Sequence, residues 1–195
     1  MKEKKIYFPS SSWNLETDPV HFYAYCKAFS KKECSKIINI AKKKGLVQGT
    51  TYGKSDARKS KVSWLYPVDD MTWVFKKVTD ITKQLNEKFF KFDIFGLNEG
   101  FQFTNYKAPS DKYKKHVDRA NNKPVRKLSI TIQLTEPTKY KGGELILYDD
   151  HKGTVMDKGQ GSVIMFPSYI LHEVKPLTKG ERNSLVCWVT GKPFV

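Results

Sequence analysis

The chain has 195 residues, of which 39% are hydrophobic, and it carries a formal net charge of +15. This length and apolar content suffice for one well-buried core, so we expect a single domain over residues 1–195. No apolar run approaches the roughly 20 residues of a membrane-spanning helix, and the first residues, MKEKKIYFPSSSW, lack the apolar stretch of a secretion signal, so we expect a cytoplasmic protein without membrane association.

The segment SKKECSKIINIAKKKG has the features of an amphipathic helix. Ser30 and Glu33 have the spacing of a capping box, and Gly45 provides a natural C-terminal stop. The apolar residues of the segment fall on one helical face, and they are Cys34, Ile37, Ile38 and Ala41. We therefore expect a helix that packs this face against a flat surface.

A second helix is predicted from about Asp69 to Phe89, with Asp69 or Asp70 as its N-cap. Its apolar residues repeat at helical spacing and again form one stripe, which consists of Met71, Val74, Val78, Ile81, Leu85 and Phe89. Two helices with one apolar stripe each indicate that both cover the same kind of flat partner.

The second half of the chain contains short β-rich runs between turn signals. In chain order they are GFQFTNY, KLSITIQL, GELILYD, GTVM, GSVIMFP, LHEV and NSLVCWV. Because no helical period separates them, they favour an antiparallel sandwich or barrel over alternating βαβ units. We expect a mainly β fold of the α+β class, in which a helical lead-in over about 28–92 supports a β core over about 97–192.

A pair of candidate metal ligands lies in YKKHVDRANN. On a strand, residues two apart point to the same side, so His116 and Asp118 could hold one ion between them. His172 follows the apolar run GSVIMFP, at the start of a further strand, and could supply a third ligand. Two imidazoles and one carboxylate leave three positions open on an octahedral ion, which suits non-haem Fe(II) that must also bind a cosubstrate and oxygen.

An anionic cosubstrate would need a positive charge at its far end. Arg182 follows His172 after the reversal KPLTKGER, which we expect to bring it beside the strand of His172. A guanidinium group can hold a carboxylate through two parallel hydrogen bonds, which lysine cannot do. Ser184 should point the same way and could add a hydroxyl.

A resemblance to a known family is carried by YKAPSDKYKKHVD, KLSITIQLTEPTKYKGGEL and GSVIMFPSYILHEVKPLTKGERNSLVCW. These segments resemble the catalytic core of Fe(II)- and 2-oxoglutarate-dependent dioxygenases, in the prolyl 4-hydroxylase-like branch that includes PKHD-type hydroxylases. The segment KAFSKKECSKIINIAKKKG is similar to the helical lead-in of that branch. The resemblance spans about half the chain, Gln102–Trp188, and implies a double-stranded β-helix, or jelly roll, with N-terminal helices on the major sheet.

The resemblance also implies roles for single residues. The implied iron ligands are His116, Asp118 and His172. Arg182 would bind the distal carboxylate of 2-oxoglutarate, where collagen-type prolyl hydroxylases use lysine.

Further implied roles concern aromatic residues near the cosubstrate. Tyr106 and Tyr113 match tyrosines that line the cosubstrate pocket, and Trp188 matches an aromatic residue of the last core strand. Ile132 stands where some relatives have another cosubstrate-binding tyrosine, so Thr131 could supply that polar contact. Between the two tyrosines many relatives have a glycine-rich turn, whereas this chain has KAPSDK, which predicts a differently shaped mouth of the site.

The implied activity is oxidative decarboxylation of 2-oxoglutarate coupled to hydroxylation of a C–H bond. Its cofactor would be Fe(II), its cosubstrates 2-oxoglutarate and O2, and ascorbate would support turnover. The resemblance makes a prolyl residue of a protein or peptide the first expected substrate. The sequence does not indicate an oligomeric state.

Two other functions stay open. The charge of +15 favours acidic partners, so a nucleic-acid-directed oxygenase is one alternative, although a solvated lysine-rich surface also explains the charge. The basic residues around the ligand pair are Lys107, Lys112, Lys114, Lys115, Arg119, Lys123 and Arg126. The other alternative is a jelly-roll binding module without enzymatic activity.

Two smaller motifs favour structural explanations. His151 beside Asp149 and Asp150 is read as an exposed turn instead of a second metal site. Gly142 and Gly143 are read as a bulge or tight turn instead of a phosphate loop, because no helix start follows them.

Overall fold

A computed structural model of the chain describes residues 22–50, 56–118, 125–149 and 151–193. Its strands are β1 (Ala24–Lys27), β2 (Val47–Gln48), β3 (Arg58–Lys59), β4 (Lys61–Leu65), β5 (Ile94–Gly96), β6 (Phe101–Lys107), β7 (Lys112–His116), β8 (Arg126–Gln133), β9 (Tyr140–Gly142), β10 (Leu145–Tyr148), β11 (Thr154–Val155), β12 (Ser162–Pro167), β13 (Leu171–Val174) and β14 (Leu177–Gly191).

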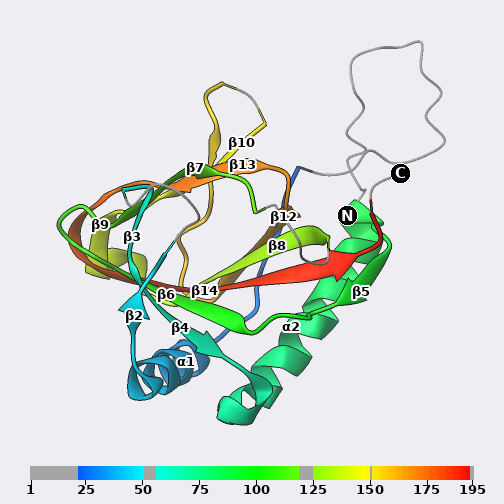
Figure 1. Cartoon of the computed structure of the whole chain (residues 1–195), viewed down its shortest axis with the longest axis horizontal. Helices are drawn as coiled ribbons and strands as arrows, with labels where there is room; N and C mark the ends of the chain where they lie inside the picture. Colours follow the sequence, from blue (N-terminus) through cyan, green and yellow to red (C-terminus); the bar gives the residue numbers. More distant parts are fainter. Residues whose placement is uncertain (1–21, 51–55, 119–124, 150, 194–195) are drawn as a thin grey trace.

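Within the described residues these strands form two antiparallel sheets (Figure 1). The large sheet has the order β1-β12-β8-β14-β6-β4-β2, with β5 and β9 also paired to β14. The small sheet has the order β11-β10-β13-β7-β3. Side chains of both sheets meet in one apolar cluster that includes Ile164 and Phe166 from the large sheet and Leu147 and Val174 from the small one. The fold is therefore a two-sheet jelly roll, as expected.

Every strand that the alternating segments predicted is present, as β6, β8 and β10 to β14. The runs did not cover β1 to β5, β7 or β9, although β7 carries His116, which was expected on a strand. Three of the missed strands, β2, β3 and β4, lie between the helices, inside the lead-in that was expected to be helical. Strands of two to five residues carry too few alternations to be separated from a loop by sequence pattern.

The first helix, α1 (Lys31–Lys44), has the predicted ends. The Glu33 N–H donates to Ser30 Oγ (3.2 Å), and the Ser30 N–H donates to the Glu33 carboxylate (2.7 Å), which completes the capping box. Gly45 ends the helix with a φ of +102°, a conformation that glycine adopts without strain. The predicted apolar face is confirmed, with Cys34, Ile37 and Ala41 buried.

The second predicted helix contains a π-helical turn, η1 (Pro67–Met71), then α2 (Thr72–Leu85) and a second π-helical turn, η2 (Asn86–Phe90). The predicted aspartate cap is wrong, because Met71 is the N-cap and Asp70 lies one residue earlier with a φ of +58°. Asp69 instead accepts the Tyr66 N–H (2.7 Å) and pairs with Lys44 of α1 (2.6 Å), so it closes the preceding turn. No helix in the described part of the chain is both long and apolar enough to cross a membrane.

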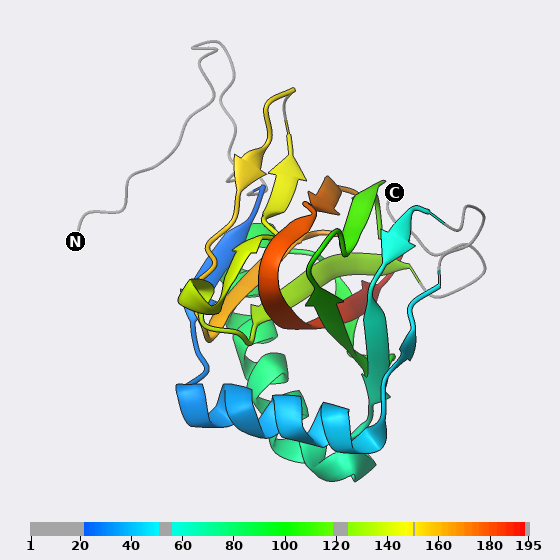
Figure 2. The same ribbon diagram turned by 90° about the vertical axis from the view of Figure 1, so that its left-hand side faces the viewer.

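Both helices lie on one side of the large sheet (Figure 2). Side chains along β8 point alternately to the two faces of the sheet. Leu128, Ile130 and Ile132 give one face an apolar surface on which α1 and α2 pack, and the residues between them point to the opposite face. The same alternation holds in β6 and β14, where Phe103, Leu185 and Cys187 join that core. The opposite face, called the inner face below, is turned toward the small sheet.

Candidate metal centre

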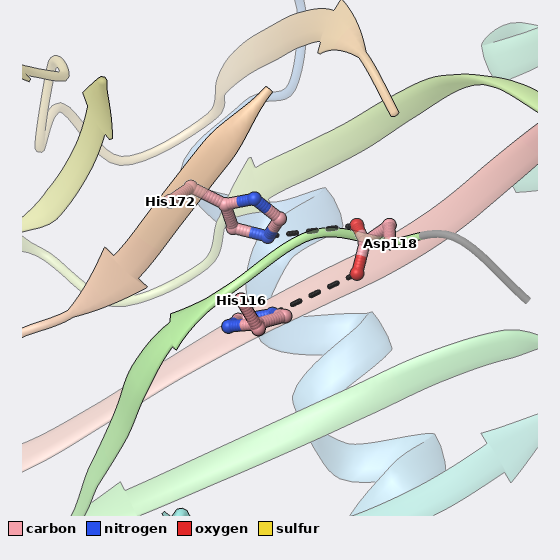
Figure 3. A group of neighbouring side chains, drawn as sticks. All are labelled: His116, Asp118 and His172. Carbon is pink, nitrogen blue, oxygen red and sulfur yellow. Dashed lines mark ion pairs between the residues drawn. The ribbon is translucent and has the colours of Figure 1, made fainter. Parts of the chain in front are cut away.

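The three predicted metal ligands converge between the two sheets (Figure 3). His116 ends β7 and His172 lies directly opposite it on β13. Asp118 lies two residues past the end of β7, so the expectation that it shares a strand with His116 is wrong. Its N–H donates to the carbonyl of Ser168, which holds the turn in place (3.0 Å). One donor atom from each of the three side chains lies within 4.8 Å of the others.

Both imidazoles are oriented by their backbone. His116 Nδ1 lies 2.7 Å from the carbonyl oxygen of Lys114, and His172 Nδ1 lies 2.9 Å from that of Ile170. A carbonyl can only accept, so each Nδ1 carries the proton and each Nε2 presents a lone pair, which is the arrangement of metal-binding histidines. Burial and the neighbouring imidazole of His172 lower the pKa of His116 to about 4, so its ring is neutral at neutral pH.

The carboxylate of Asp118 faces both lone pairs. Its oxygens lie 3.7 Å from His116 Nε2 and 3.6 Å from His172 Nε2, too far for hydrogen bonds but suited to a cation bridging all three groups. Burial raises the pKa of this carboxyl, but the imidazoles of His172 and His116 and a hydrogen bond from Ser129 (2.7 Å) outweigh burial and hold the pKa below its ordinary value. The group is therefore an anion, as a metal ligand must be.

Tyr113 contacts the site through an irregularity in β7. His116 is paired with His172 and Tyr113 with Val174, so β7 uses three residue steps where β13 uses two. The extra residue is a bulge, and it turns Tyr113 and His116 to the same side. Their rings stack with centroids 3.5 Å apart. The structure thus brings Tyr113 against a candidate ligand.

Arg182 lies on β14, opposite Tyr106 on β6. The expectation that it returns beside the strand of His172 is wrong, because β14 belongs to the large sheet and β13 to the small one. The Arg182 side chain is 2% exposed, donates to Gln133 Oε1 (2.9 Å) and lies 5.5 Å from the centroid of the Tyr106 ring. A Cβ at Gly143 would clash with Leu177 Cδ1 and would come within 3.2 Å of Arg182 Cδ, so the predicted glycine turn lets the chain pass close to both side chains.

The remaining predicted residues divide by face. Ser184 and Trp188 alternate with the outward Leu185 and Cys187 and therefore belong to the inner face, where both are buried. Trp188 Nε1 is enclosed without a hydrogen bond of normal geometry among the described residues, yet it lies close enough to Asp118 to lower the pKa of that carboxyl.

The two residues considered for a missing tyrosine also lie on different faces of β8. Ile132 packs in the core under the helices, so it has no place in the site. Thr131 is on the inner face, and so is Gln133, the partner of Arg182, which sequence reasoning missed. A usable signal existed in KLSITIQL, because Ser129, Thr131 and Gln133 repeat with a period of two inside an apolar strand.

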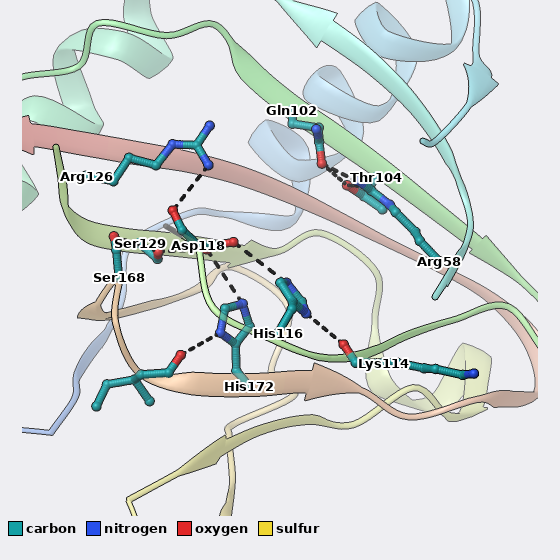
Figure 4. Close-up of polar contacts among 11 residues, drawn as sticks. Arg58, Gln102, Thr104, Lys114, His116, Asp118, Arg126, Ser129, Ser168 and His172 are labelled. Atoms are coloured by element: carbon teal, nitrogen blue, oxygen red, sulfur yellow. Dashed lines mark hydrogen bonds and ion pairs between the residues drawn. The ribbon is translucent and has the colours of Figure 1, made fainter. Parts of the chain in front are cut away.

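A partly buried arginine, Arg126, supports the site at its Asp118 end (Figure 4). Arg126 makes two hydrogen bonds to Glu99, of 2.7 and 2.6 Å, and donates a longer one to the carbonyl of Asp118 (3.4 Å). Its guanidinium carbon also lies 3.8 Å from the centroid of a Trp188 ring. Arg126 therefore holds both the turn that carries Asp118 and the indole beside it.

The other basic residues near the ligand pair are mostly engaged by neighbours. Lys114 pairs with Asp56 (2.5 Å), Lys107 lies 3.8 Å from Glu181, and Lys115 stacks on Tyr148. Arg119 and Lys123 lie outside the described residues, as does Asp150. His151 is exposed, and the metal-binding geometry found in the described part of the chain is that of the three convergent residues.

Comparison with known proteins agrees with this geometry. Residues 101–190 match the family model of the 2OG-Fe(II) oxygenase superfamily. A PKHD-type hydroxylase of Idiomarina loihiensis is 37% identical over 78 residues, which are 40% of this chain and 36% of that protein. Another, from Shewanella oneidensis, is 36% identical over 92 residues, 45% of this chain and 41% of that protein. The chain thus aligns with about two fifths of the length of these relatives.

Solved structures share the fold at low identity. A prolyl-4-hydroxylase of Pseudomonas putida superposes with a TM-score of 0.69 and 19% identity, covering 89% of this chain and 94% of that one. A Trichoplax adhaerens prolyl hydroxylase gives a TM-score of 0.71 and 19% identity, covering 87% and 84%. The matched segment and the partial relatives thus make this chain similar to the 2OG-Fe(II) oxygenase superfamily and to PKHD-type hydroxylases, and the solved structures show the same fold.

Proposed function

We propose that the protein is an Fe(II)- and 2-oxoglutarate-dependent dioxygenase that hydroxylates a C–H bond. The observation that carries the proposal is the convergence of two imidazole Nε2 atoms and one carboxylate in a space between two sheets. Similarity to the 2OG-Fe(II) oxygenase superfamily supports Fe(II), 2-oxoglutarate and O2 as the cofactor and cosubstrates. Ascorbate, which keeps iron reduced, is proposed as an aid to turnover.

The side chains present fit an iron ion. His116 and His172 would bind it through Nε2, and Asp118 would bind through its carboxylate, which leaves the remaining positions of an octahedral ion open. Ser129 fixes the carboxylate that faces both histidines, and the backbone carbonyls fix both rings, so the three groups are oriented before any ion arrives. When bound, iron supplies the site at which O2 oxidises 2-oxoglutarate to succinate and carbon dioxide and transfers one oxygen atom to the substrate.

Arg182 is proposed to hold the distal carboxylate of 2-oxoglutarate. Of its donors, Nη2 contacts the neutral Gln133, and no carboxylate pairs with the group within the described residues. Tyr106, its partner across the strands, and Ser184, two residues along β14, are polar groups on the same inner face. Tyr113 and Trp188 would wall the space beside the ligands and exclude water.

The proposed substrate is a prolyl residue of a protein or peptide. Its support is the prolyl hydroxylase names of the structural neighbours, one of which was solved with a peptide fragment of the hypoxia inducible factor oxygen degradation domain. The proposal treats the described residues as one domain, because the helices pack directly on the sheet that carries Arg182.

The test is succinate formation from 2-oxoglutarate with Fe(II), O2 and ascorbate. His116→Ala, Asp118→Ala and His172→Ala should each reduce the rate by at least about a thousandfold, because loss of one of three ligands removes the bound metal on which the rate depends. Lys175→Ala is a control three residues from His172, directly after the end of β13, since the Lys175 side chain is 42% exposed and pairs with Glu173. Equal turnover by wild type and the three ligand variants would refute the proposal.

A further inference from the structure

Arg58 is a second buried arginine between the two sheets. It lies on β3 at the edge of the small sheet, directly opposite Tyr113 of β7, and it is 8% exposed. Strand β3 has two residues, and nothing in its sequence pattern distinguished Arg58 from the surface lysines around it. Its guanidinium group is buried because β3 pairs with β7.

All hydrogen-bond partners of this guanidinium group in the described part of the chain are neutral, and Figure 4 shows two of them, Gln102 and Thr104. Nε donates to Ser60 (2.8 Å), and Nη2 donates to Gln102 (2.8 Å) and Thr104 (3.3 Å). Nη1 has no partner among the described residues, and it is not one of the fully enclosed polar atoms, so it remains reachable from solvent. Nε and Nη2 of this buried cation are thus fixed by hydrogen bonds, whereas Nη1 is available to a ligand.

No carboxylate of the described residues compensates this charge. The acidic residues that flank β3 and β7 are used elsewhere, because Asp56 pairs with Lys114 (2.5 Å) and Asp111 with Lys59 (3.8 Å). Burial of a cation without an anionic partner is costly, so such a group is usually kept for a ligand.

Arg58 also belongs to the wall of the metal centre. Its guanidinium carbon lies 4.9 Å from the centroid of the Tyr113 ring, and that ring stacks on His116 at 3.5 Å. One aromatic ring therefore separates Arg58 from a candidate iron ligand. A group bound to Arg58 would therefore lie one side chain, that of Tyr113, away from the candidate ligand His116.

Charge balance shows what kind of group is missing. Fe(II) and the dianion of 2-oxoglutarate would neutralise each other, and Arg126 is neutralised by Glu99. The remaining charges are the carboxylate of Asp118 and the guanidinium groups of Arg182 and Arg58, which leave one positive charge in excess. Of the two carboxylates of 2-oxoglutarate, one would bind the metal and the other Arg182, so neither the cosubstrate nor the described residues would supply an anion for Arg58.

We propose that Arg58 binds a carboxylate of the substrate, and that the substrate is a peptide with Asp or Glu near the oxidised residue. The inference rests on the proposed function, because it places that peptide in the same site. Three neutral partners hold Nε and Nη2 in place, and Nη1 stays available. Nη1 could therefore donate to a single carboxylate without any movement of the guanidinium group.

The experiment uses the iron-loaded protein, 2-oxoglutarate and a library of proline-containing peptides in which acids and their amides are equally frequent. Products are identified by the gain of one oxygen in mass spectrometry. Asp or Glu should be enriched at a fixed position relative to the oxidised residue. For an enriched peptide, kcat/KM should exceed that of its Asn or Gln counterpart by about 10- to 100-fold, the range of one charge-assisted hydrogen bond.

The decisive variant is Arg58→Gln, for which this ratio should fall to near one whatever happens to the overall rate. Arg58→Lys keeps the charge and should retain part of the preference, which guards against a fold defect. Lys59→Gln is the matched control, because it removes one positive charge from the adjacent residue, whose side chain is 58% exposed, and should leave the ratio unchanged. The same pattern should appear in peptide dissociation constants measured with Mn(II) and 2-oxoglutarate without O2, where no turnover occurs.

The outcomes separate the two proposals. Failure of the wild type to convert 2-oxoglutarate would refute the proposed function itself. Oxidised peptides without acidic enrichment, or succinate formation without any oxidised peptide, would overturn the role of Arg58 and leave the reaction standing. An Arg58→Gln protein with a raised KM for 2-oxoglutarate and an unchanged acid-to-amide ratio would overturn it too, because Arg58 would then serve the cosubstrate.

Discussion

The face of the large sheet under the helices and the inner face share their strands but not their chemistry. Along β14, Leu185, Cys187 and Val189 point to the helices, whereas Arg182 and Ser184 point inward. These three outward side chains have no polar group apart from the thiol of Cys187, and all three are close to fully buried. The inner residues are equally buried, yet several of their polar groups lack charged partners within the described part of the chain.

This difference separates stability from function along a single strand. Burial of the outer side chains contributes stability through the hydrophobic effect and close packing. Burial of polar groups on the inner face contributes little and can cost stability, because some of them lack charged partners within the described residues and bind ligands in the proposed function. Substitutions on adjacent residues should therefore affect different measurements.

Leu185→Ala should have the largest effect, and on stability alone. The Leu185 side chain is fully buried among the helices and strands, so the substitution leaves a cavity and should reduce the free energy of unfolding by about 2–5 kcal/mol. In urea unfolding, Ser184→Ala on the inner face should cost far less. The KM for 2-oxoglutarate of the folded Leu185→Ala protein should match the wild-type value. A KM shift as large as that of an inner-face variant would contradict the separation of the two faces.

Arg182→Gln should show the opposite pattern. Loss of the charge-assisted hydrogen bonds to the cosubstrate should raise the KM for 2-oxoglutarate by about 10- to 100-fold. The free energy of unfolding should stay the same or rise without 2-oxoglutarate, because a buried guanidinium group with the neutral partner Gln133 is removed. With Mn(II) present throughout, added 2-oxoglutarate should raise the melting temperature of the wild type by more than that of the variant. An unchanged KM would exclude Arg182 as the anchor.

The sequence predicted the outer face better than the inner one. Helix ends and apolar stripes are local signals, and the capping box of Ser30 and Glu33 is read correctly within four residues. The ligand set was predicted because three side chains of the required chemistry follow strand signals in order. By contrast, the environment of Arg58 depends on Gln102 and Thr104, more than forty residues away in the chain. No local pattern reports such pairing.

Two further misses have the same cause. The bulge that brings Tyr113 against His116 is a property of the register between β7 and β13, which the sequence of β7 does not contain. The predicted aspartate cap of α2 is wrong because Asp69 forms an ion pair with Lys44 of α1 and closes the turn before α2 instead. In each case a contact between distant elements replaced the local preference.

The smallest effect is expected at Glu33, on the outer side of the protein. Its carboxylate accepts hydrogen bonds from Lys77 of α2 (2.7 Å) and from the Ser30 N–H (2.7 Å). The hydrogen bond from Lys77 is the main cause that lowers the pKa of Glu33 below its ordinary value of 4.5, and the Ser30 N–H adds to it. Because the pKa is lower in the folded state, the ionised carboxylate stabilises the fold above the unfolded pKa, and this contribution is lost as the pH falls through the folded value.

Glu33→Gln should therefore be less stable than wild type at pH 7, and the difference should vanish in acid, below the folded pKa of Glu33. The loss should stay within about 1 kcal/mol, because the pair is solvent-exposed and screened by salt. Lys77→Met, which removes the main cause of the shift, should narrow the gap at pH 7, and succinate formation should be unchanged in both variants. Urea unfolding from pH 7 to pH 3 measures this, and a gap that persists undiminished at pH 3 would show that Glu33 acts through packing. The pair joins α1 to α2 on the far side of the sheet from the metal centre, so it can change how firmly the helices hold the sheet without changing what the inner face binds.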